Sequence, residues 1–115
     1  MNKSPGKGPI SISLGVIGGS GAYDLLTNGA LGENVDTITL ETPFGKSAPI
    51  HHFRAGNLEY LFLSRHGEKD YSVTAPFVNY RANIYALKEC GVERIISWSG
   101  PGIINTSFKP GEYVL

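Results

Sequence analysis

The sequence has a single cysteine, no excess charge of either sign and no apolar run long enough to cross a membrane. Cys90 cannot form an internal disulfide, and one free thiol suits a reducing compartment. Ten basic residues balance ten acidic ones, so no overall charge attracts nucleic acid or an anionic surface. No signal peptide is recognisable either. We therefore expect a cytoplasmic protein without nucleic-acid or membrane partners, in which any anion is bound by a local site.

Motifs for metals and nucleotides are also lacking. His51 and His52 are adjacent, so on a strand they point to opposite faces, and His66 stands alone. There is no GK[ST] phosphate loop, which disfavours kinase or NTPase chemistry. The spacing of a dinucleotide-binding loop fails as well, because Asp24 stands where its third glycine belongs. We expect no metal and no cofactor.

The composition is that of one small folded domain. The chain has 115 residues, of which 41% are hydrophobic and 17% charged. Residues 1–9 are basic and rich in glycine and proline, and we expect them to form a flexible leader. Residues 10–115 are then the domain. Its last residues, 111–115, are apolar and predict the start of a strand, as if the chain were cut within it.

Hydrophobic patterning predicts an α/β fold with a mixed sheet flanked by helices. The expected strands are residues 10–17, 34–40, 50–54, 58–63 and 92–98, with a turn at 42–46 and a hairpin connection at 55–57. A short helical segment is expected at 22–26 and a longer helix at 76–90. For the longer helix we expect Thr74 as N-cap, Gly91 as the terminating glycine, and an apolar stripe formed by Phe77, Tyr80, Ile84 and Leu87.

A glycine loop follows the first of these strands. Gly18, Gly19, Ser20 and Gly21 allow a ligand to approach the backbone closely, and their N–H groups with the Ser20 hydroxyl can surround an anion. Our hypothesis is that this loop holds phosphate, either free or esterified. The alternative is a glycine turn that only reverses the chain.

Two further polar groups follow later strands. Arg65 and His66 come directly after residues 58–63, and Ser99 with Gly100 comes after residues 92–98. Since ligands collect at the carboxyl ends of strands in α/β folds, these groups converge on one small anion if the strands are neighbours. Alternatively, Arg65 pairs with a nearby carboxylate while His66 caps a loop. Trp98 is interpreted as a core residue rather than a platform for stacking a base.

The sequence resembles the methylthioadenosine phosphorylase branch of the trimeric purine nucleoside phosphorylases. The motifs that carry the resemblance are GVIGGSG at 15–21 followed by Tyr23 and Asp24, TPFGK at 42–46, RHG at 65–67, VNYRANIYALK at 78–88 and PGEYV at 110–114. They extend over nearly all of this chain but over only about the N-terminal half of a family member. The resemblance therefore implies a nucleoside phosphorylase-like fold in truncated form.

The resemblance also implies a reaction and a site. The expected reaction is a pentosyl transfer of purine salvage: phosphate, as co-substrate, cleaves the glycosidic bond of a purine nucleoside, 5′-methylthioadenosine or 5′-methylthioinosine, into free base and sugar 1-phosphate. By motif position the phosphate-binding residues are Ser20, Arg65, His66, Ser99 and Gly100, supported by Gly18, Gly19 and Gly21. No catalytic side chain beyond these and no metal is implied. The family assembles as homo-oligomers, trimers or hexamers.

Departures from the family keep other functions open. Residues 68–71 replace the second histidine that usually follows the RHG motif, and Pro101 removes a backbone donor from the later loop, which weakens the alignment of Ser99. The family's base-binding and sugar-binding residues have no counterpart in these 115 residues. The alternatives are a non-catalytic truncated remnant that associates through its sheet, and a phosphate- or nucleotide-binding module that lacks the base-binding half.

Overall fold

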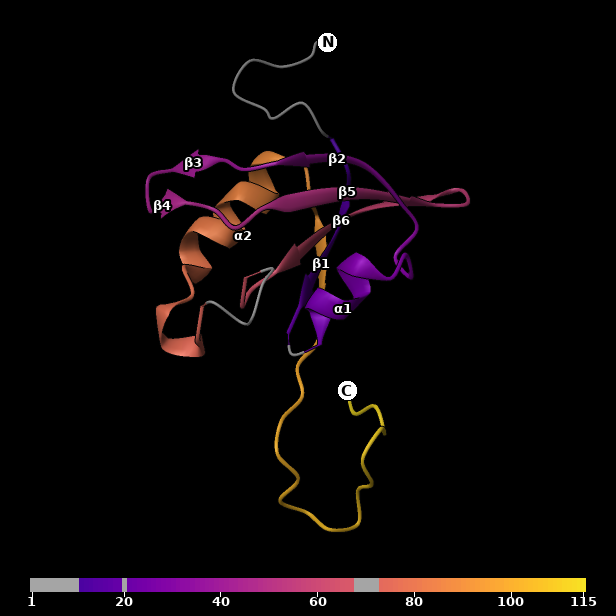
Figure 1. Ribbon diagram of the computed structural model, residues 1–115. Coiled ribbons are helices and arrows are strands. Elements are labelled where there is room, and N and C mark those ends of the chain that lie inside the picture. Colours follow the sequence, from indigo (N-terminus) through magenta and orange to yellow (C-terminus); the bar gives the residue numbers. More distant parts are fainter. Residues whose placement is uncertain (1–10, 20, 68–72) are drawn as a thin grey trace.

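The computed structural model describes residues 11–19, 21–67 and 73–115 (Figure 1). The elements, in chain order, are β1 (Leu14–Gly18), α1 (Ala22–Thr27), β2 (Glu33–Ile38), β3 (Glu41–Thr42), β4 (Gly45–Lys46), β5 (Ile50–Ala55), β6 (Leu58–Ser64), the 3₁₀ helix η1 (Ala75–Phe77), α2 (Tyr80–Glu89) and β7 (Arg94–Ser97). The expected leader at 1–9 and the predicted site residue Ser20 lie outside the described residues.

The main sheet has five strands in the order β2-β5-β6-β1-β7. β2, β5 and β6 are antiparallel neighbours, whereas β6, β1 and β7 run parallel. The predicted α/β fold with a mixed sheet is thus confirmed. β3 and β4 form a separate small hairpin where a turn was expected. The parallel half matters for function, because β6, β1 and β7 deliver their carboxyl ends to the same edge of the sheet (Figure 1).

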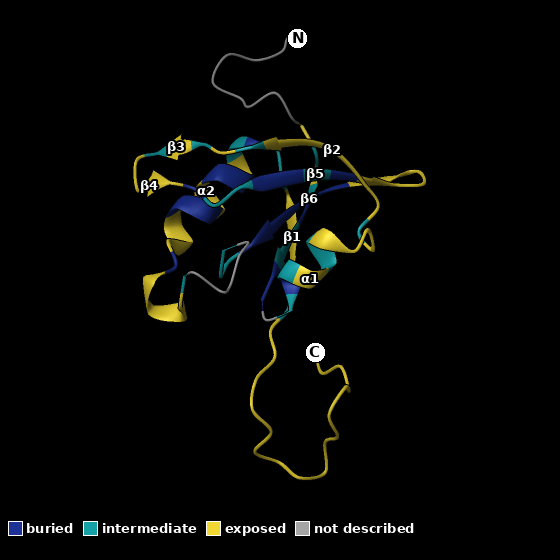
Figure 2. Ribbon diagram, viewed as in Figure 1, coloured by how far each residue is buried: buried dark blue, intermediate teal, exposed yellow. Residues whose placement is uncertain are grey.

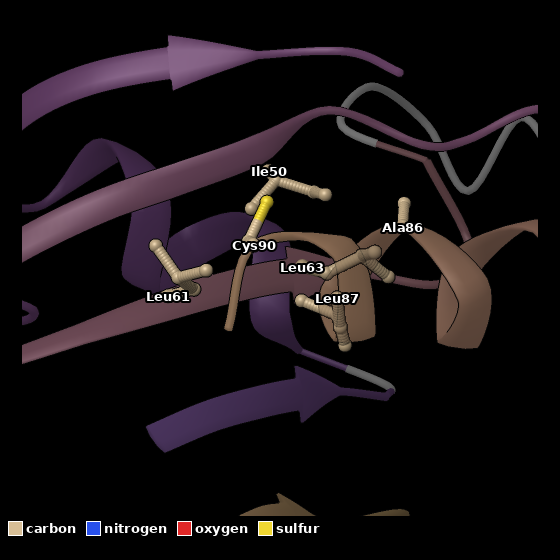
Figure 3. Close-up of a cluster of buried hydrophobic side chains, with 6 residues drawn as sticks. All are labelled: Ile50, Leu61, Leu63, Ala86, Leu87 and Cys90. Carbon is tan, nitrogen blue, oxygen red and sulfur yellow. The ribbon is translucent and has the colours of Figure 1, made fainter. Parts of the chain in front are cut away.

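The strand β6 is buried on both faces, and its alternating side chains feed two hydrophobic clusters. Leu61 and Leu63 point toward α2, where they meet Ala86, Leu87 and Cys90 (Figure 3). Tyr60 and Phe62 join the opposite cluster with Ala22 of α1 and Phe53 of β5. The two helices therefore cover opposite faces of the sheet. In Figure 2 the buried residues follow β5, β6 and the inner side of α2.

Three local predictions are confirmed. Trp98 is half-buried and packs against Phe62 with 5.9 Å between the ring centroids, so it is a core residue. Gly91 ends α2 with φ +94°, a conformation that residues with a Cβ rarely adopt. The β5–β6 hairpin forms as expected, and its connection is Gly56–Asn57.

The predicted start of the long helix was wrong. α2 begins at Tyr80, and its N-cap is Asn79, whose side chain accepts a hydrogen bond from the backbone N–H of Ala82 at 3.1 Å. The segment around Pro76 forms η1 instead, with Thr74 at its N-cap but without a side-chain hydrogen bond. Val78 separates the two helices with an extended backbone, φ −67° and ψ 131°, so the chain cannot continue helically from Pro76.

The predicted apolar stripe was also wrong for three of its four members. Phe77, Tyr80 and Ile84 are 80%, 50% and 47% exposed, and only Leu87 is buried. The buried face of α2 consists of Ala82, Asn83, Ala86 and Leu87. Small alanines allow the helix backbone to approach the sheet closely, which the pattern of large residues could not indicate.

The strand expected at 111–115 does not form. Residues 98–115, all of them described, contain turns but no strand, and Tyr113 is 98% exposed. β7, with 4 residues, is an edge strand that pairs only with β1 within the described sheet. An apolar sequence gains little from extended structure without a neighbouring strand to pair with. Among the described residues, no helix combines the length and apolarity needed to cross a bilayer.

Candidate functional site

Three segments meet at the carboxyl ends of the parallel strands. Gly18 lies opposite Ser64 in the register of β1 with β6, and Ile17 lies opposite Ser97 in the register with β7. Backbone hydrogen bonds continue both pairings to the next residue. The N–H of Arg65 donates to the carbonyl oxygen of Gly18 at 3.2 Å, and the N–H of Trp98 donates to the carbonyl oxygen of Ile17 at 3.2 Å. The segments that follow β1, β6 and β7 are therefore neighbours, as the hypothesis required.

Gly19 lies at the centre of this arrangement. A Cβ placed on it would lie 2.6 Å from the carbonyl oxygen of Trp98, 2.9 Å from Nη2 of Arg65 and 3.2 Å from Cα of Ser99. No side chain fits there without displacing backbone atoms, so the position requires glycine. The same distances show that the Arg65 guanidinium and the Ser99 backbone both lie against the glycine loop.

The neighbouring glycines have separate structural reasons. A Cβ on Gly18 would lie 2.7 Å from Cβ of Ala22 and 2.8 Å from the ring of Phe62, so its absence lets α1 pack onto the sheet. Gly21 has φ +85° and is the N-cap of α1. Both positions therefore support the turn from β1 into α1, as expected for residues that shape the loop.

Arg65 is held by its sequence neighbour. Its Nε donates to Nε2 of His66 at 3.2 Å, while Nδ1 of His66 lies 3.0 Å from the carbonyl oxygen of Val73. A carbonyl can only accept, so Nδ1 carries the proton and Nε2 offers its lone pair to Arg65. This assigns a neutral imidazole in one tautomer. His66 thereby orients the guanidinium.

The alternative interpretation has a counterpart in the segment after β6, where the N–H of Val73 donates to the carbonyl of His66 at 3.1 Å. The ion pairs among the described residues join His52 and Arg54 to glutamates of the sheet, and none involves Arg65. Nη2 instead faces Gly19. Of the other predicted residues, Ser99 and Gly100 are exposed, with the Ser99 backbone beside Gly19.

A cavity of about 580 Å³ adjoins Arg65 on the side of α2. Its wall includes Lys46, Ala48, Arg65, Val73, Phe77 and Asn83. Sequence reasoning missed Lys46 and Asn83. Lys46 belongs to the TPFGK motif, which could have drawn attention to it, whereas Asn83 is a polar residue whose sequence position carries no signal of burial.

Nothing in the described part of the chain groups three side chains suited to hold a metal ion. His51 is buried with Nδ1 2.9 Å from the hydroxyl of Thr37, whereas His52 contacts Glu59 at 2.7 Å. The two adjacent imidazoles thus have separate surroundings, as predicted for neighbours on a strand.

The fold is a mixed α/β sheet in which an arginine and a glycine loop meet at the carboxyl ends of the parallel strands. The chain belongs to the phosphorylase superfamily, whose family model matches residues 13–115. The resemblance to methylthioadenosine and purine nucleoside phosphorylases is thereby confirmed.

Proteins with similar sequences are named as nucleoside phosphorylases. The chain is 45% identical to a probable 6-oxopurine nucleoside phosphorylase of Thermococcus kodakarensis over 102 residues, which cover 89% of the chain and 36% of that protein. It is 42% identical to an S-methyl-5′-thioadenosine phosphorylase of Thermofilum pendens over 108 residues, covering 90% and 38%. The crystal structure of methylthioadenosine phosphorylase from Schistosoma mansoni with tubercidin matches with a TM-score of 0.65 and 35% identity, covering 76% of this chain and 29% of that one. The chain thus spans about a third of the length of the curated relatives it matches.

Proposed function

We propose that these residues form the phosphate-binding part of a purine nucleoside phosphorylase that acts on 5′-methylthioadenosine or 5′-methylthioinosine. The observation that carries the proposal is the contact region around Gly19, where the Arg65 guanidinium and the Ser99 backbone meet at the ends of parallel strands. The names of the relatives support the choice of purine nucleosides as substrates. Because the chain spans about a third of their length, we assign phosphate binding to these residues and turnover to the whole architecture.

The proposed role of each residue follows from its chemistry. Arg65 offers planar N–H donors to the phosphate oxygens, and backbone N–H groups of the glycine loop with the hydroxyls of Ser20 and Ser99 complete the set. One cation and several neutral donors orient phosphate without fully neutralising it, which leaves an oxygen nucleophilic. His66 acts through Arg65, whose orientation it fixes.

The proposed reaction is a displacement at the anomeric carbon. A phosphate oxygen forms a bond to that carbon while the bond to the purine nitrogen breaks, and the bonding electrons leave with the base, which takes up a proton. The products are free base and sugar 1-phosphate. Holding the anion against the reacting carbon supplies positioning and electrostatic stabilisation without a metal. We further propose a cytoplasmic homo-oligomer, a trimer or hexamer.

Release of purine base tests this function. With 5′-methylthioadenosine and 5′-methylthioinosine as substrates, we expect base release by the whole protein that depends on phosphate and yields a sugar 1-phosphate. Release without phosphate would indicate a hydrolase instead. Phosphate binding without base release would favour the second candidate, a phosphate- or nucleotide-binding module.

A further inference from the structure

The cavity beside Arg65 has the chemistry of a ligand site distinct from the contact region around Gly19. It lies between the β4–β5 connection and the start of α2, and its volume of about 580 Å³ is within the range of small-molecule sites. Phosphate alone fills only a small part of such a space. The cavity therefore suits a larger ligand.

The charges on its wall select an anion. Lys46 and Arg65 both line the cavity, and none of the described lining residues is acidic. Glu41 is the cross-strand neighbour of Lys46, yet no ion pair joins them. The positive charges of Lys46 and Arg65 together favour a dianion over a carboxylate with a single charge.

Asn83 adds a buried donor. Its residue is only 5% exposed, and its Oδ1 accepts a hydrogen bond from the N–H of Ala48 at 2.9 Å. The Nδ2 group has no hydrogen-bond partner among the described residues. A buried amide N–H₂ group without a partner is destabilising, so its place on a cavity wall points to a ligand acceptor.

Beside the polar residues Ser47 and Asn79, the wall also has an apolar part. The apolar residues that line the cavity are Ala48, Pro49, Val73 and Phe77. Phe77 is 80% exposed, so most of its surface is available to a ligand. These side chains can cover an apolar body attached to the anionic group. The wall therefore matches a molecule that combines both features.

We propose that this cavity binds a phosphate monoester with an apolar substituent, held by Lys46, Arg65 and the Nδ2 group of Asn83. A phosphate monoester carries close to two negative charges at neutral pH. Lys46 contacts it from the exposed rim and Asn83 from the buried wall, while the substituent packs on Val73 and Phe77. The site shares Arg65 with the proposed phosphate site, whereas Lys46 and Asn83 belong to the cavity alone.

Phenyl phosphate is a suitable probe, with inorganic phosphate and phenol for comparison. Titration calorimetry on the 115-residue chain measures the three affinities. Lys46→Gln removes the rim charge, and Asn83→Asp keeps the acceptor for Ala48 while replacing the donor with an anionic oxygen. Lys88→Gln is the matched control, since Lys88 is exposed in the last turn of α2 and lines no part of the cavity.

We expect phenyl phosphate to bind more tightly than either inorganic phosphate or phenol. Both cavity variants should lower the affinity for phenyl phosphate at least about fivefold, because each loses one charge-assisted hydrogen bond. Lys88→Gln should leave this affinity unchanged. Unchanged affinity for phenyl phosphate in Lys46→Gln, a variant on an exposed hairpin that should fold normally, would overturn the proposal. An equal loss of affinity for phenyl phosphate and for inorganic phosphate in both variants would also overturn the proposal, because the cavity would then be part of the phosphate site. Arg65 belongs to both sites, so Arg65→Ala should weaken the binding of phosphate and of phenyl phosphate alike. Loss of phosphate binding in Arg65→Ala with unchanged phenyl phosphate binding in Lys46→Gln would contradict this proposal and leave the proposed function standing.

Discussion

The Nε group of Arg65 donates a hydrogen bond to Nε2 of His66 at 3.2 Å, and this contact fixes both the tautomer of the imidazole and the direction of the guanidinium. The imidazole is anchored in turn by its Nδ1 group, 3.0 Å from the carbonyl of Val73. Two sequence neighbours directly after β6 thus form one unit, in which Nη2 of Arg65 faces Gly19.

The first prediction concerns this unit. His66→Phe keeps a ring but removes both nitrogens, so Arg65 loses its acceptor. We expect the affinity for phosphate to fall about fivefold, which corresponds to about 1 kcal/mol for one hydrogen bond. His66→Gln, which can still accept from Arg65, should recover part of the loss. Calorimetric titration of phosphate measures both variants, and full affinity in His66→Phe would contradict the positioning role.

The second prediction concerns Gly19. Gly19→Ala places a Cβ 2.6 Å from the carbonyl of Trp98, and the backbone must shift. We expect a loss of about 1–3 kcal/mol in the free energy of unfolding, as for other overpacked sites, together with weaker phosphate binding. Gly102→Ala is the control, because a Cβ there meets nothing within 4 Å. Urea denaturation compares the two, and equal stability would show that the three loops are not in contact.

The third prediction tests the observed orientation of α2. Leu87 is fully buried whereas Ile84 is 47% exposed on the same helix. Leu87→Ala should lower the free energy of unfolding by about 2–5 kcal/mol, as large-to-small core substitutions do. Ile84→Ala should cost less than about 1 kcal/mol, because most surface substitutions have small effects. Urea denaturation measures both losses. A larger loss for Ile84→Ala than for Leu87→Ala would contradict the observed orientation of α2 and favour the apolar stripe expected from the sequence.

The fourth prediction concerns the thiol of Cys90, which is 1% exposed in the cluster beneath α2 (Figure 3). Burial, and secondarily the charge of Glu89, raises its pKa from 9.0 to about 11. The unfolded chain then loses the thiol proton at lower pH than the folded one, so stability falls as the pH rises from 9.0 to about 11.

Cys90→Ala isolates this effect, because it leaves the other titrating groups in place, including Tyr60, whose pKa burial also raises. The variant should lose less stability than the original chain over the same pH interval. A thiol reagent at neutral pH should also react slowly with Cys90 until denaturant is added. Rapid reaction in the folded chain would contradict the burial of the thiol.

Much of the sheet follows from sequence patterns. Residues 60–63, YLFL, form an apolar run without alternation, which indicates a strand segment buried on both faces, and this part of β6 is buried in that way. Gly56 permits the tight connection of the hairpin with φ +63°. The meeting of the loops after β1, β6 and β7 was predictable once these strands were taken as neighbours, because parallel strands end at one edge.

The sequence could not predict features that depend on close packing. The buried face of α2 is formed partly by Ala82 and Ala86, which a search for large apolar residues overlooks. The end of a helix depends on one residue's backbone, and the extended conformation of Val78 separates η1 from α2. Asn83 is a polar residue that becomes buried through its bond to Ala48, 35 positions away in the sequence. Such long-range pairings leave no local pattern.

Phosphate titration of the 115-residue chain and of its Arg65→Ala variant tests the central claim most directly. Arg81→Ala is the matched control, since Arg81 is an exposed arginine of α2 that lies over the ring of Phe44, 5.8 Å from its centroid. We predict that Arg65→Ala weakens phosphate binding by at least about tenfold, the loss of a charge-assisted contact, and that Arg81→Ala does not change it. Equal phosphate affinity in the original chain and in Arg65→Ala would contradict the account.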